Sequence, residues 1–301
     1  MVSVIIPTFK RHSMLFFEIE QLKKQENVSI EIIVINDEIE NDPTDSITLL
    51  YPDVIYIKSK KKIGPGEKHQ LGFSIAHGDF VSFPDDDDYL IDNLFFSKAL
   101  SIMGENPNIA FVSGNSFIKY ESETNKNEQF VKFALNVKGL YSGLDFLENM
   151  QGKYTKPLSS VPTVFRKSAL ERQGFISQIE MSDSSIYMLA SMGGDAFFID
   201  DYVSVYRIHN NSLTTKKSSS KWINNVLRQK EHILEKVEKE LKNPGQWWLR
   251  HIKLTYSFYA NTSKSRIEKA KLLMWCFKHN HGFFCTVPYL LKRFVLLLWN
   301  R

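Results

Sequence analysis

Short apolar runs alternate with stretches of helical periodicity in the first part of the chain. The apolar runs, which predict β-strands, occupy residues 2–6, 30–35, 54–57 and 80–83. Between them, residues 11–25 and 67–77 predict helices. Nearly continuous apolar strands that alternate with helices are typical of parallel sheets covered on both faces. The pattern therefore predicts an α/β fold with a Rossmann-like, mostly parallel sheet.

The rest of the chain continues this alternation and then becomes helical. Further strands are predicted at residues 108–113, 116–120, 161–166 and 196–205, with a polar turn at residues 121–128. Helices are predicted at residues 141–150, capped by Ser142, and at residues 184–191. A long helix is predicted at residues 221–242, ended by Asn243-Pro244-Gly245, and another begins at the capping box of Ser265 and Glu268. We therefore expect a C-terminal helical appendage after the α/β domain.

Charge divides the chain at the same place. The whole chain has a net charge of +4, but residues 1–215 carry 20 Lys and Arg against 29 Asp and Glu. Residues 216–301 carry 18 basic residues against 5 acidic ones, so the two parts have net charges of −9 and +13. A strongly basic region predicts contact with an anionic surface.

The last apolar stretch, residues 283–301, contains Pro288, Lys292 and Arg293, so it is too short and too charged to span a bilayer. Tryptophans beside basic residues predict helices lying at an anionic membrane surface. They are Trp222, Trp247, Trp248, Trp275 and Trp299. The alternative is a set of helices packed on the first domain with a solvated basic face, and the two interpretations are compatible.

The cysteines and the N-terminal residues bear on the compartment. Cys276 and Cys285 are the only cysteines, too few for a disulfide framework, and the chain starts with a strand rather than a signal peptide. Together with the basic appendage, this predicts a cytoplasmic protein that is peripheral at the inner face of the cell membrane.

Four consecutive carboxylates, Asp85 to Asp88, follow the strand at residues 80–83, which Pro84 ends. Open α/β sheets bind their ligands at the carboxyl ends of strands, and Thr8, Arg11 and Asp37 follow two other strands of the set. Like charges in a row stay ionised at low cost only if a cation or abundant water compensates them. Carboxylate oxygens suit Mg²⁺ or Mn²⁺. The alternative is a solvated acidic loop.

Four segments then form an ordered set. They are Ser3-Val-Ile-Ile-Pro-Thr-Phe9, the strand that ends at Asp37, Gly64-Pro-Gly-Glu-Lys-His-Gln-Leu-Gly72, and Ala76-His-Gly-Asp-Phe-Val-Ser-Phe-Pro-Asp-Asp-Asp-Asp-Tyr89. In order and spacing this set resembles the family 2 glycosyltransferases of the GT-A fold, and the likeness extends to about Thr215. The resemblance implies a catalytic domain over residues 1–215, with a nucleotide-binding half at 1–105 and an acceptor half at 106–215. The basic amphipathic helical region is then residues 216–301.

The resemblance also assigns donor-binding residues. It implies that Pro7, Thr8 and Asp37 hold the nucleoside of the donor. Arg11, three residues after Thr8, is expected to be a further donor-binding residue. Asp37 is able to accept a hydrogen bond from a base imino group, or it forms an Asx turn after its strand.

The Asp-X-Asp motif, Asp85 and Asp87, is implied to contact the ribose and diphosphate and to bind the divalent metal. We expect Asp87 to be the metal ligand and Asp85 to support the ribose, or the metal through water. Asp86 and Asp88 are alternatives for these roles, because a run of four carboxylates leaves the assignment ambiguous.

One segment departs from the family pattern. Where relatives usually carry Ala-Arg-Asn-X-Gly, this chain has Lys68-His69-Gln70-Leu71-Gly72, so His69 occupies the usual arginine position. Either His69 or Lys68 is expected to replace the arginine's contact to the nucleotide. Because neither is a planar, permanently charged guanidinium, donor affinity or base preference should differ. The alternative is that both residues face solvent on the helix.

Two residues of the acceptor half complete the expected site. The family usually reads Glu-Asp where this chain has Ser182 and Asp183, and the resemblance implies that Asp183 is the general base. A helix cap is the alternative for Asp183. Tyr206-Arg207-Ile208-His209 matches the motif that closes many family 2 domains, and His209 there completes the metal or diphosphate site, or is structural.

Taken together, these features predict an inverting glycosyltransferase that depends on Mn²⁺ or Mg²⁺. It would move a sugar from a nucleotide donor, such as a uridine diphosphate sugar, to a glycan or lipid-linked acceptor in bacterial cell-surface polysaccharide synthesis. A catalytically silent relative is one alternative. A nucleic-acid-binding protein is another, but it would leave the acidic cluster without a role. A Ca²⁺-binding EF-hand is excluded because Leu90 and Phe96 stand at the glycine and glutamate positions counted from Asp85.

Overall fold

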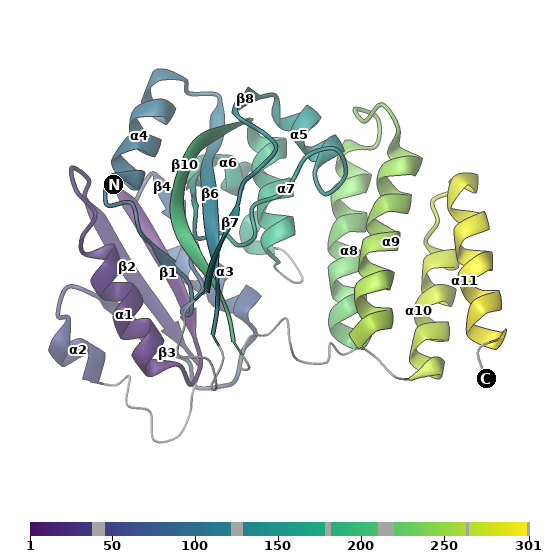
Figure 1. The fold of residues 1–301 in the computed structure, drawn as a ribbon, viewed down its shortest axis with the longest axis horizontal. Helices are drawn as coiled ribbons and strands as arrows, with labels where there is room; N and C mark the ends of the chain where they lie inside the picture. Colours follow the sequence, from purple (N-terminus) through teal and green to yellow (C-terminus); the bar gives the residue numbers. More distant parts are fainter. Residues whose placement is uncertain (38–45, 122–128, 178–181, 210–219, 263–264, 300–301) are drawn as a thin grey trace. The chain divides into compact units, whose positions relative to one another are not determined.

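The computed structural model describes residues 1–37, 46–121, 129–177, 182–209, 220–262 and 265–299. The chain divides into two compact units, Met1–Asn210 and Asn211–Arg301 (Figure 1). The first unit is an α/β domain built on a mixed sheet, and the second is helical throughout its described residues. The predicted α/β class is therefore confirmed for the first unit.

The strands follow the apolar runs of the sequence. They are β1 (Val2–Thr8), β2 (Ile30–Asn36), β3 (Ile55–Lys58), β4 (Phe80–Ser82), β5 (Tyr89–Leu90), β6 (Ile109–Tyr120), β7 (Gln129–Phe133), β8 (Gly139–Tyr141), β9 (Thr163–Arg166) and β10 (Asp195–Ile208). The main order across the sheet is β3-β2-β1-β4-β9-β6-β10-β5, with β7 beside β6 and β8 beside β10. β1 pairs in parallel with β2 and β4, and β2 pairs in parallel with β3, whereas β9 is antiparallel to both of its neighbours. The carboxyl ends of the first four strands therefore meet at one edge.

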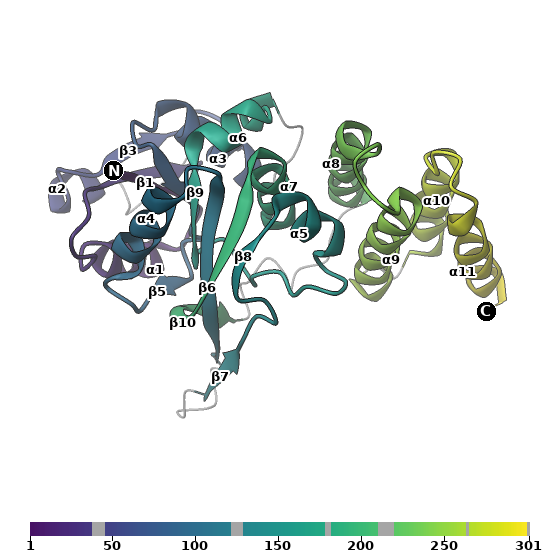
Figure 2. The same ribbon diagram turned by 90° about the horizontal axis from the view of Figure 1, so that it is seen from above.

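Helices cover both faces of this sheet. They are α1 (His12–Leu22), α2 (Ile47–Leu50), α3 (Pro65–Ile75), α4 (Phe95–Glu105), α5 (Gly143–Asn149), α6 (Lys167–Arg172) and α7 (Asp183–Gly193), with a 3₁₀ turn η2 (Phe175–Ser177). Figure 2 shows α1 and α4 on one side of the sheet and α3 on the other. Alternate β1 residues face the two sides, so that Val4 lies in the core with α1 and α4 while Ile5 meets α3.

The contact between β1 and α3 is close enough to require a glycine. A Cβ atom at Gly72 would lie 2.3 Å from Ile5 Cγ2, which no packing arrangement tolerates. The same face carries an aromatic cluster in which Phe83 packs on Phe73, Phe165 and Phe175. Because only Pro84 separates Phe83 from the carboxylate run, this cluster anchors the segment that carries the run.

Two predicted boundaries are wrong. The strands expected at residues 108–113 and 116–120 are a single strand, β6, because Gly114 stays in the ladder with its N–H donated to the Pro162 carbonyl at 2.9 Å. Pro244, which was predicted to end a helix, is the first residue of α9. Proline is favourable there because the N–H groups of a first turn have no acceptor within the helix, so the missing N–H costs no hydrogen bond. The predicted polar turn at 121–128 lies almost entirely outside the described residues.

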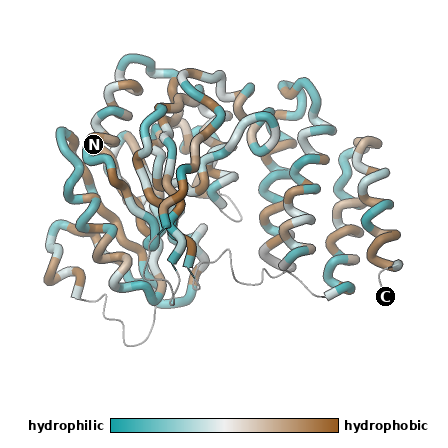
Figure 3. Tube along the Cα trace, viewed as in Figure 1, coloured by the Kyte–Doolittle hydropathy of each residue, from teal (hydrophilic) through white to brown (hydrophobic). Residues whose placement is uncertain are grey.

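The second unit is a set of helices, α8 (Ser220–Val237), α9 (Pro244–Thr262), α10 (Arg266–Lys278) and α11 (Val287–Trp299), with a 3₁₀ turn η4 (Phe284–Thr286). α8 packs on α9, and α10 packs on α11 (Figure 1). Trp247 and Trp248 are buried in this core, so their predicted place at a membrane surface is wrong. Within the described residues, no helix is long and apolar enough to cross a membrane. Figure 3 shows the apolar residues concentrated in the strands and along α11.

Candidate active site

The carboxylate run forms the connection between β4 and β5 at the carboxyl end of β4. The N–H of Asp88 donates to the carbonyl of Asp85 at 3.3 Å, so the segment turns back on itself. This turn brings together Asp85, Asp87 and Asp88, whose carboxylates each offer one oxygen within 4.8 Å of the others. Asp86 is bonded instead to Thr8, the last residue of β1, and to Arg11. The turn thus separates one carboxylate from the other three.

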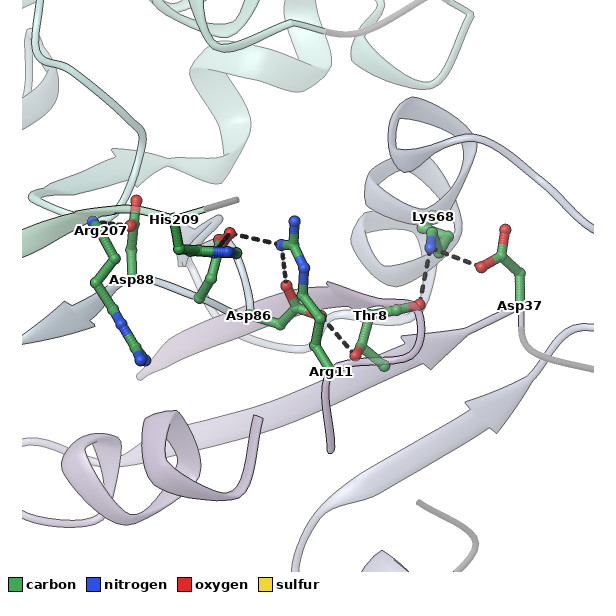
Figure 4. A network of polar contacts seen from close by, with 9 residues as sticks. Thr8, Arg11, Asp37, Lys68, Asp86, Asp88, Arg207 and His209 are labelled. Carbon is green, nitrogen blue, oxygen red and sulfur yellow. Dashed lines mark hydrogen bonds and ion pairs between the residues drawn. The ribbon is translucent and has the colours of Figure 1, made fainter. Parts of the chain in front are cut away.

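Asp86 is held by the last residue of β1 and by Arg11 after it. The Thr8 hydroxyl donates to Asp86 Oδ2 at 2.7 Å, and Arg11 Nη1 donates to Asp86 Oδ1 at 2.8 Å (Figure 4). The same guanidinium nitrogen lies 2.6 Å from Asp87 Oδ2. Burial raises the pKa of Asp86, and the positive charge of Arg11 opposes that rise. Arg11 is therefore a counterion of the acidic segment.

The end of β10 closes the other side of this segment. His209 Nε2 lies 3.0 Å from Asp87 Oδ2, and the backbone N–H of Arg207 donates to Asp88 Oδ1 at 2.8 Å (Figure 4). The guanidinium of Arg207 points to Glu121, with bonds of 2.8 and 3.1 Å to its two oxygens. In the closing motif, Arg207 therefore fixes the backbone, while His209 presents its ring to Asp87.

Asp37 and Lys68 form a second polar cluster next to Thr8. Lys68 Nζ donates to Asp37 Oδ1 and to the Thr8 carbonyl, both at 2.8 Å, and the N–H of Ile63 donates to Asp37 Oδ2 at 3.0 Å. These bonds join the ends of β1 and β2 to the first turn of α3 (Figure 4). Among the described residues each Asp37 oxygen accepts one hydrogen bond, and a carboxylate oxygen has room for a second donor.

His69 lies in a different environment from Lys68. Its ring packs edge-on against Phe83, with centroids 5.3 Å apart, and its Nε2 has no partner among the described residues. Burial, reinforced by the charge of Lys68, lowers the pKa of His69 to about 3, so the imidazole is neutral. The alternative that Lys68 and His69 face solvent is wrong, because both are buried. Pro7 is also buried, inside β1 opposite Ile35.

Asp183 is the first residue of α7, and Ser182 is its N-cap, with the Ser182 hydroxyl accepting the N–H of Ser185 at 3.3 Å. The alternative that Asp183 itself is the cap is therefore wrong. Burial raises the pKa of Asp183, the charge of Lys156 opposes this, and the charge of Asp87 adds to it. Burial and the charge of Asp183 likewise raise the pKa of Asp85. The first turn of α7 thus faces the carboxylate cluster.

Comparison with known proteins agrees with this geometry. A family model described as Glycosyl transferase family 2 matches residues 3–174. The chain belongs to glycosyl transferase family 2. A relative from Campylobacter jejuni, GalNAc(5)-diNAcBac-PP-undecaprenol beta-1,3-glucosyltransferase, is 30% identical over 72% of this chain and 68% of its own length. Four bacterial relatives described as uncharacterized glycosyltransferases are matched over only 24–37% of their own length.

Solved structures give the fold of this family 2 glycosyltransferase. TarS 1-349 from S. aureus in complex with UDP aligns with a TM-score of 0.65 at 17% identity, over 91% of this chain and 77% of that one. The mannosyltransferase PcManGT from Pyrobaculum calidifontis, in complex with GDP-Man and Mn²⁺, aligns with a TM-score of 0.50 at 15% identity, over 100% of this chain and 87% of that one. The predicted GT-A fold and glycosyltransferase class are thus confirmed.

The donor set of this family 2 glycosyltransferase fits a divalent cation. Three carboxylates offer the hard oxygen ligands that Mg²⁺ and Mn²⁺ prefer. Asp88 Oδ2 is buried and has no hydrogen-bond partner among the described residues. Burial and repulsion between the carboxylates raise the pKa values of Asp85 and Asp88, which a bound cation would reverse. Of the two alternatives left open by the sequence, Asp88 lies with Asp85 and Asp87, whereas Asp86 does not. His209, also expected as a ligand, lies 3.0 Å from Asp87 Oδ2.

The sequence did not predict two residues near this site, Glu18 and Lys156. Glu18 lies on α1 in full burial, with neither oxygen bonded among the described residues, and burial and the charge of Asp86 raise its pKa well above its usual range. Its signal was a carboxylate among Leu15, Ile19 and Leu22 on the apolar face of a predicted helix. Lys156 lies 5.2 Å from the ring centroid of Tyr187, one turn beyond Asp183 on α7. No sequence pattern marks Lys156.

Proposed function

We propose that this family 2 glycosyltransferase transfers a sugar from a uridine diphosphate donor to a lipid-linked glycan acceptor, with inversion at the anomeric carbon. The observation that carries the proposal is the group of Asp85, Asp87 and Asp88 oxygens, which faces Asp183 across the end of the sheet. The name of the Campylobacter jejuni relative, which describes an undecaprenol-linked glycan, supports the acceptor class. The UDP bound to TarS supports the donor class.

Asp183 and Lys156 act on the acceptor side. Asp183 accepts the proton of the acceptor hydroxyl as the acceptor oxygen bonds to the anomeric carbon, and the bond from that carbon to the diphosphate oxygen breaks. Raised by burial, the pKa of Asp183 lies closer to neutrality than that of a solvated aspartate, which suits a general base. Lys156 keeps the carboxylate ionised against the charges of the acidic segment.

On the donor side, Asp87 with Asp85 and Asp88 would hold Mn²⁺ or Mg²⁺, which supplies charge neutralisation for the departing diphosphate. Thr8 and Arg11 position Asp86 against the donor, and Asp37 with Lys68 lies where the nucleoside would bind. His69 has no charge to offer the diphosphate, so Lys68 is the better substitute for the missing arginine.

The cellular role follows from the acceptor. We place the enzyme at the inner face of the cytoplasmic membrane, where it would extend a glycan for the bacterial cell surface. The +13 net charge of residues 216–301 supports attraction to anionic lipid headgroups.

The test is a screen of nucleotide sugars for hydrolysis and transfer, with and without Mn²⁺. We expect turnover of a uridine diphosphate sugar that stops in chelator-treated buffer, and loss of turnover in Asp87→Ala with the fold intact. Asp53→Ala serves as the control, because Asp53 is an exposed carboxylate paired only with Lys23 among the described residues. Normal activity in chelator, or in Asp87→Ala, would exclude the metal role.

A further inference from the structure

The outer face of α11 is apolar. Leu291, Val295, Leu298 and Trp299 are between 53% and 82% exposed, and their spacing places them on one stripe of the helix. Leu290, on the opposite side, is the buried residue of this helix. A water-facing helix normally shows the reverse pattern, with polar residues outside. The stripe is therefore a surface that water does not favour.

α10 shows a mixed version of the same pattern. Ile267 and Met274 are exposed on the face that also carries Lys271 and Lys278, at the spacing of successive helical turns. Phe284, in the turn between α10 and α11, is 88% exposed. Apolar side chains interleaved with lysines suit the boundary between headgroups and acyl chains, where the lysine amines reach back to water and phosphate.

Charge decides which partner fits this surface. Residues 266–299 contain six Lys and Arg and a single acidic residue, Glu268. A second copy that docked through the same face would present the same positive charge and be repelled. A bilayer with anionic headgroups complements both the charge and the apolar stripe.

We propose that the exposed faces of α10 and α11, with Phe284 between them, insert into the interfacial layer of an anionic bilayer. The inference deepens the proposed function and rests on it in one respect, since a lipid-linked acceptor is found in that layer. Here the binding residues are Leu291, Val295, Leu298 and Trp299, with Lys271 and Lys278 contacting headgroups. Trp247 and Trp248 take no part, because they lie in the core of the helical unit.

The experiment measures binding of the full chain to vesicles of phosphatidylcholine and phosphatidylglycerol. Leu291→Gln/Leu298→Gln should bind roughly tenfold more weakly than the parent, because two apolar side chains no longer enter the interface. The matched control is Leu49→Gln/Leu50→Gln on α2, where both leucines are also exposed, and its binding should equal that of the parent. Lys271→Gln/Lys278→Gln should lose binding at low salt and respond less to added salt.

A second readout is the emission of Trp299, which should shift to shorter wavelength with anionic vesicles in the parent and not in Trp299→Phe. Equal vesicle binding by the parent and Leu291→Gln/Leu298→Gln would overturn the inference. So would a parent that is dimeric in solution and becomes monomeric in that variant, since a second copy would then cover the stripe. Far-UV circular dichroism and thermal unfolding of the variants check their folding. Vesicle binding needs no donor, so either proposal is able to fail without the other.

Discussion

Replacing Arg11 with glutamine isolates the counterion of the acidic segment. The guanidinium pairs with Asp86 at 2.8 Å and with Asp87 at 2.6 Å, and the three side chains retain only 17%, 4% and 11% of their exposure. Glutamine is polar and keeps much of the length of the side chain but carries no charge. In Arg11→Gln without a divalent cation, the two carboxylates therefore lose their shared cation while they remain buried.

The expected loss of stability is substantial. Removing one partner of a buried ion pair costs about 3–5 kcal/mol, and the partial exposure of Arg11 favours the lower end, about 3 kcal/mol. For a unit of this size each kcal/mol lowers the melting temperature by about 2–4 °C, which gives a decrease of about 6–12 °C. The loss should grow as the pH rises above the usual range of an aspartate pKa. Burial already raises the pKa of Asp86, and without Arg11 that pKa rises further, so protonation rescues the variant at low pH and fails at high pH.

The assay is thermal unfolding of the full chain in chelator and again in Mn²⁺. Lys23→Gln is the matched control, because Lys23 forms an exposed ion pair of 2.9 Å with Asp53, and such pairs contribute about 0–1 kcal/mol. Mn²⁺ should stabilise Arg11→Gln more than the parent, since a bound cation replaces the missing charge.

Two results would contradict the role of Arg11 as counterion. One is a melting temperature of Arg11→Gln in chelator within about 2 °C of that of Lys23→Gln. The other is a rise of the melting temperature with Mn²⁺ that is no larger for Arg11→Gln than for the parent. The first result would mean that Arg11 does not compensate the carboxylates. The second would mean that the cation and the guanidinium act on different groups.

Three further predictions test other residues. Asp183→Asn should lower turnover by roughly 10²–10⁴-fold with donor affinity unchanged, as measured by steady-state kinetics and donor titration. Near-normal turnover would mean that another carboxylate is the general base. Lys156→Met should raise the pKa of Asp183, so that the fall of turnover at acidic pH begins at a higher pH, whereas Lys156→Arg should behave like the parent. An unchanged pH dependence of turnover in Lys156→Met would contradict the interaction of Lys156 with Asp183. Burial lowers the pKa of Lys230 from 10.5 to about 8. At pH values between these two, the Lys230 amine is therefore protonated in the unfolded chain and neutral in the folded one. Stability should rise by about 3 kcal/mol as the pH increases through this window, and Lys230→Met should abolish the rise in urea unfolding, whereas the same slope in both proteins would exclude Lys230.

Much of the fold was predictable because its signals are local. The runs that became β1, β2 and β4 are apolar and β-branched or aromatic, and the residues after them gather at one edge because parallel strands end together. Ser142 and Ser265 cap their helices as predicted, each accepting an N–H three residues on. Local signals failed where two readings share the same residues, as at Pro244, which is able to end one helix or to begin the next.

The residues that the sequence did not reveal depend on tertiary placement. Glu18 falls on the apolar face of α1, and only the fold shows that this face lies beneath Asp86 and Arg207. Lys156 comes close to Asp183 through the packing of its segment on Tyr187, which no spacing in the chain encodes. His69 looked like a donor contact because of its position in a motif, whereas its ring is buried against Phe83.

The four aspartates show how the fold resolves an ambiguity in the sequence. In an extended segment alternate side chains point to opposite sides, so Asp85 and Asp87 would share one side and Asp86 the other. Asp86 meets Thr8 and Arg11, whereas the turn closed by the Asp88 N–H and the Asp85 carbonyl returns Asp88 to the side of Asp85 and Asp87. Since Asp86 already uses both oxygens on β1 and Arg11, it is the carboxylate least available to a cation. We therefore propose Asp85 and Asp87 as the two aspartates of the family 2 Asp-X-Asp pattern, with Asp86 between them and Asp88 as a further candidate ligand.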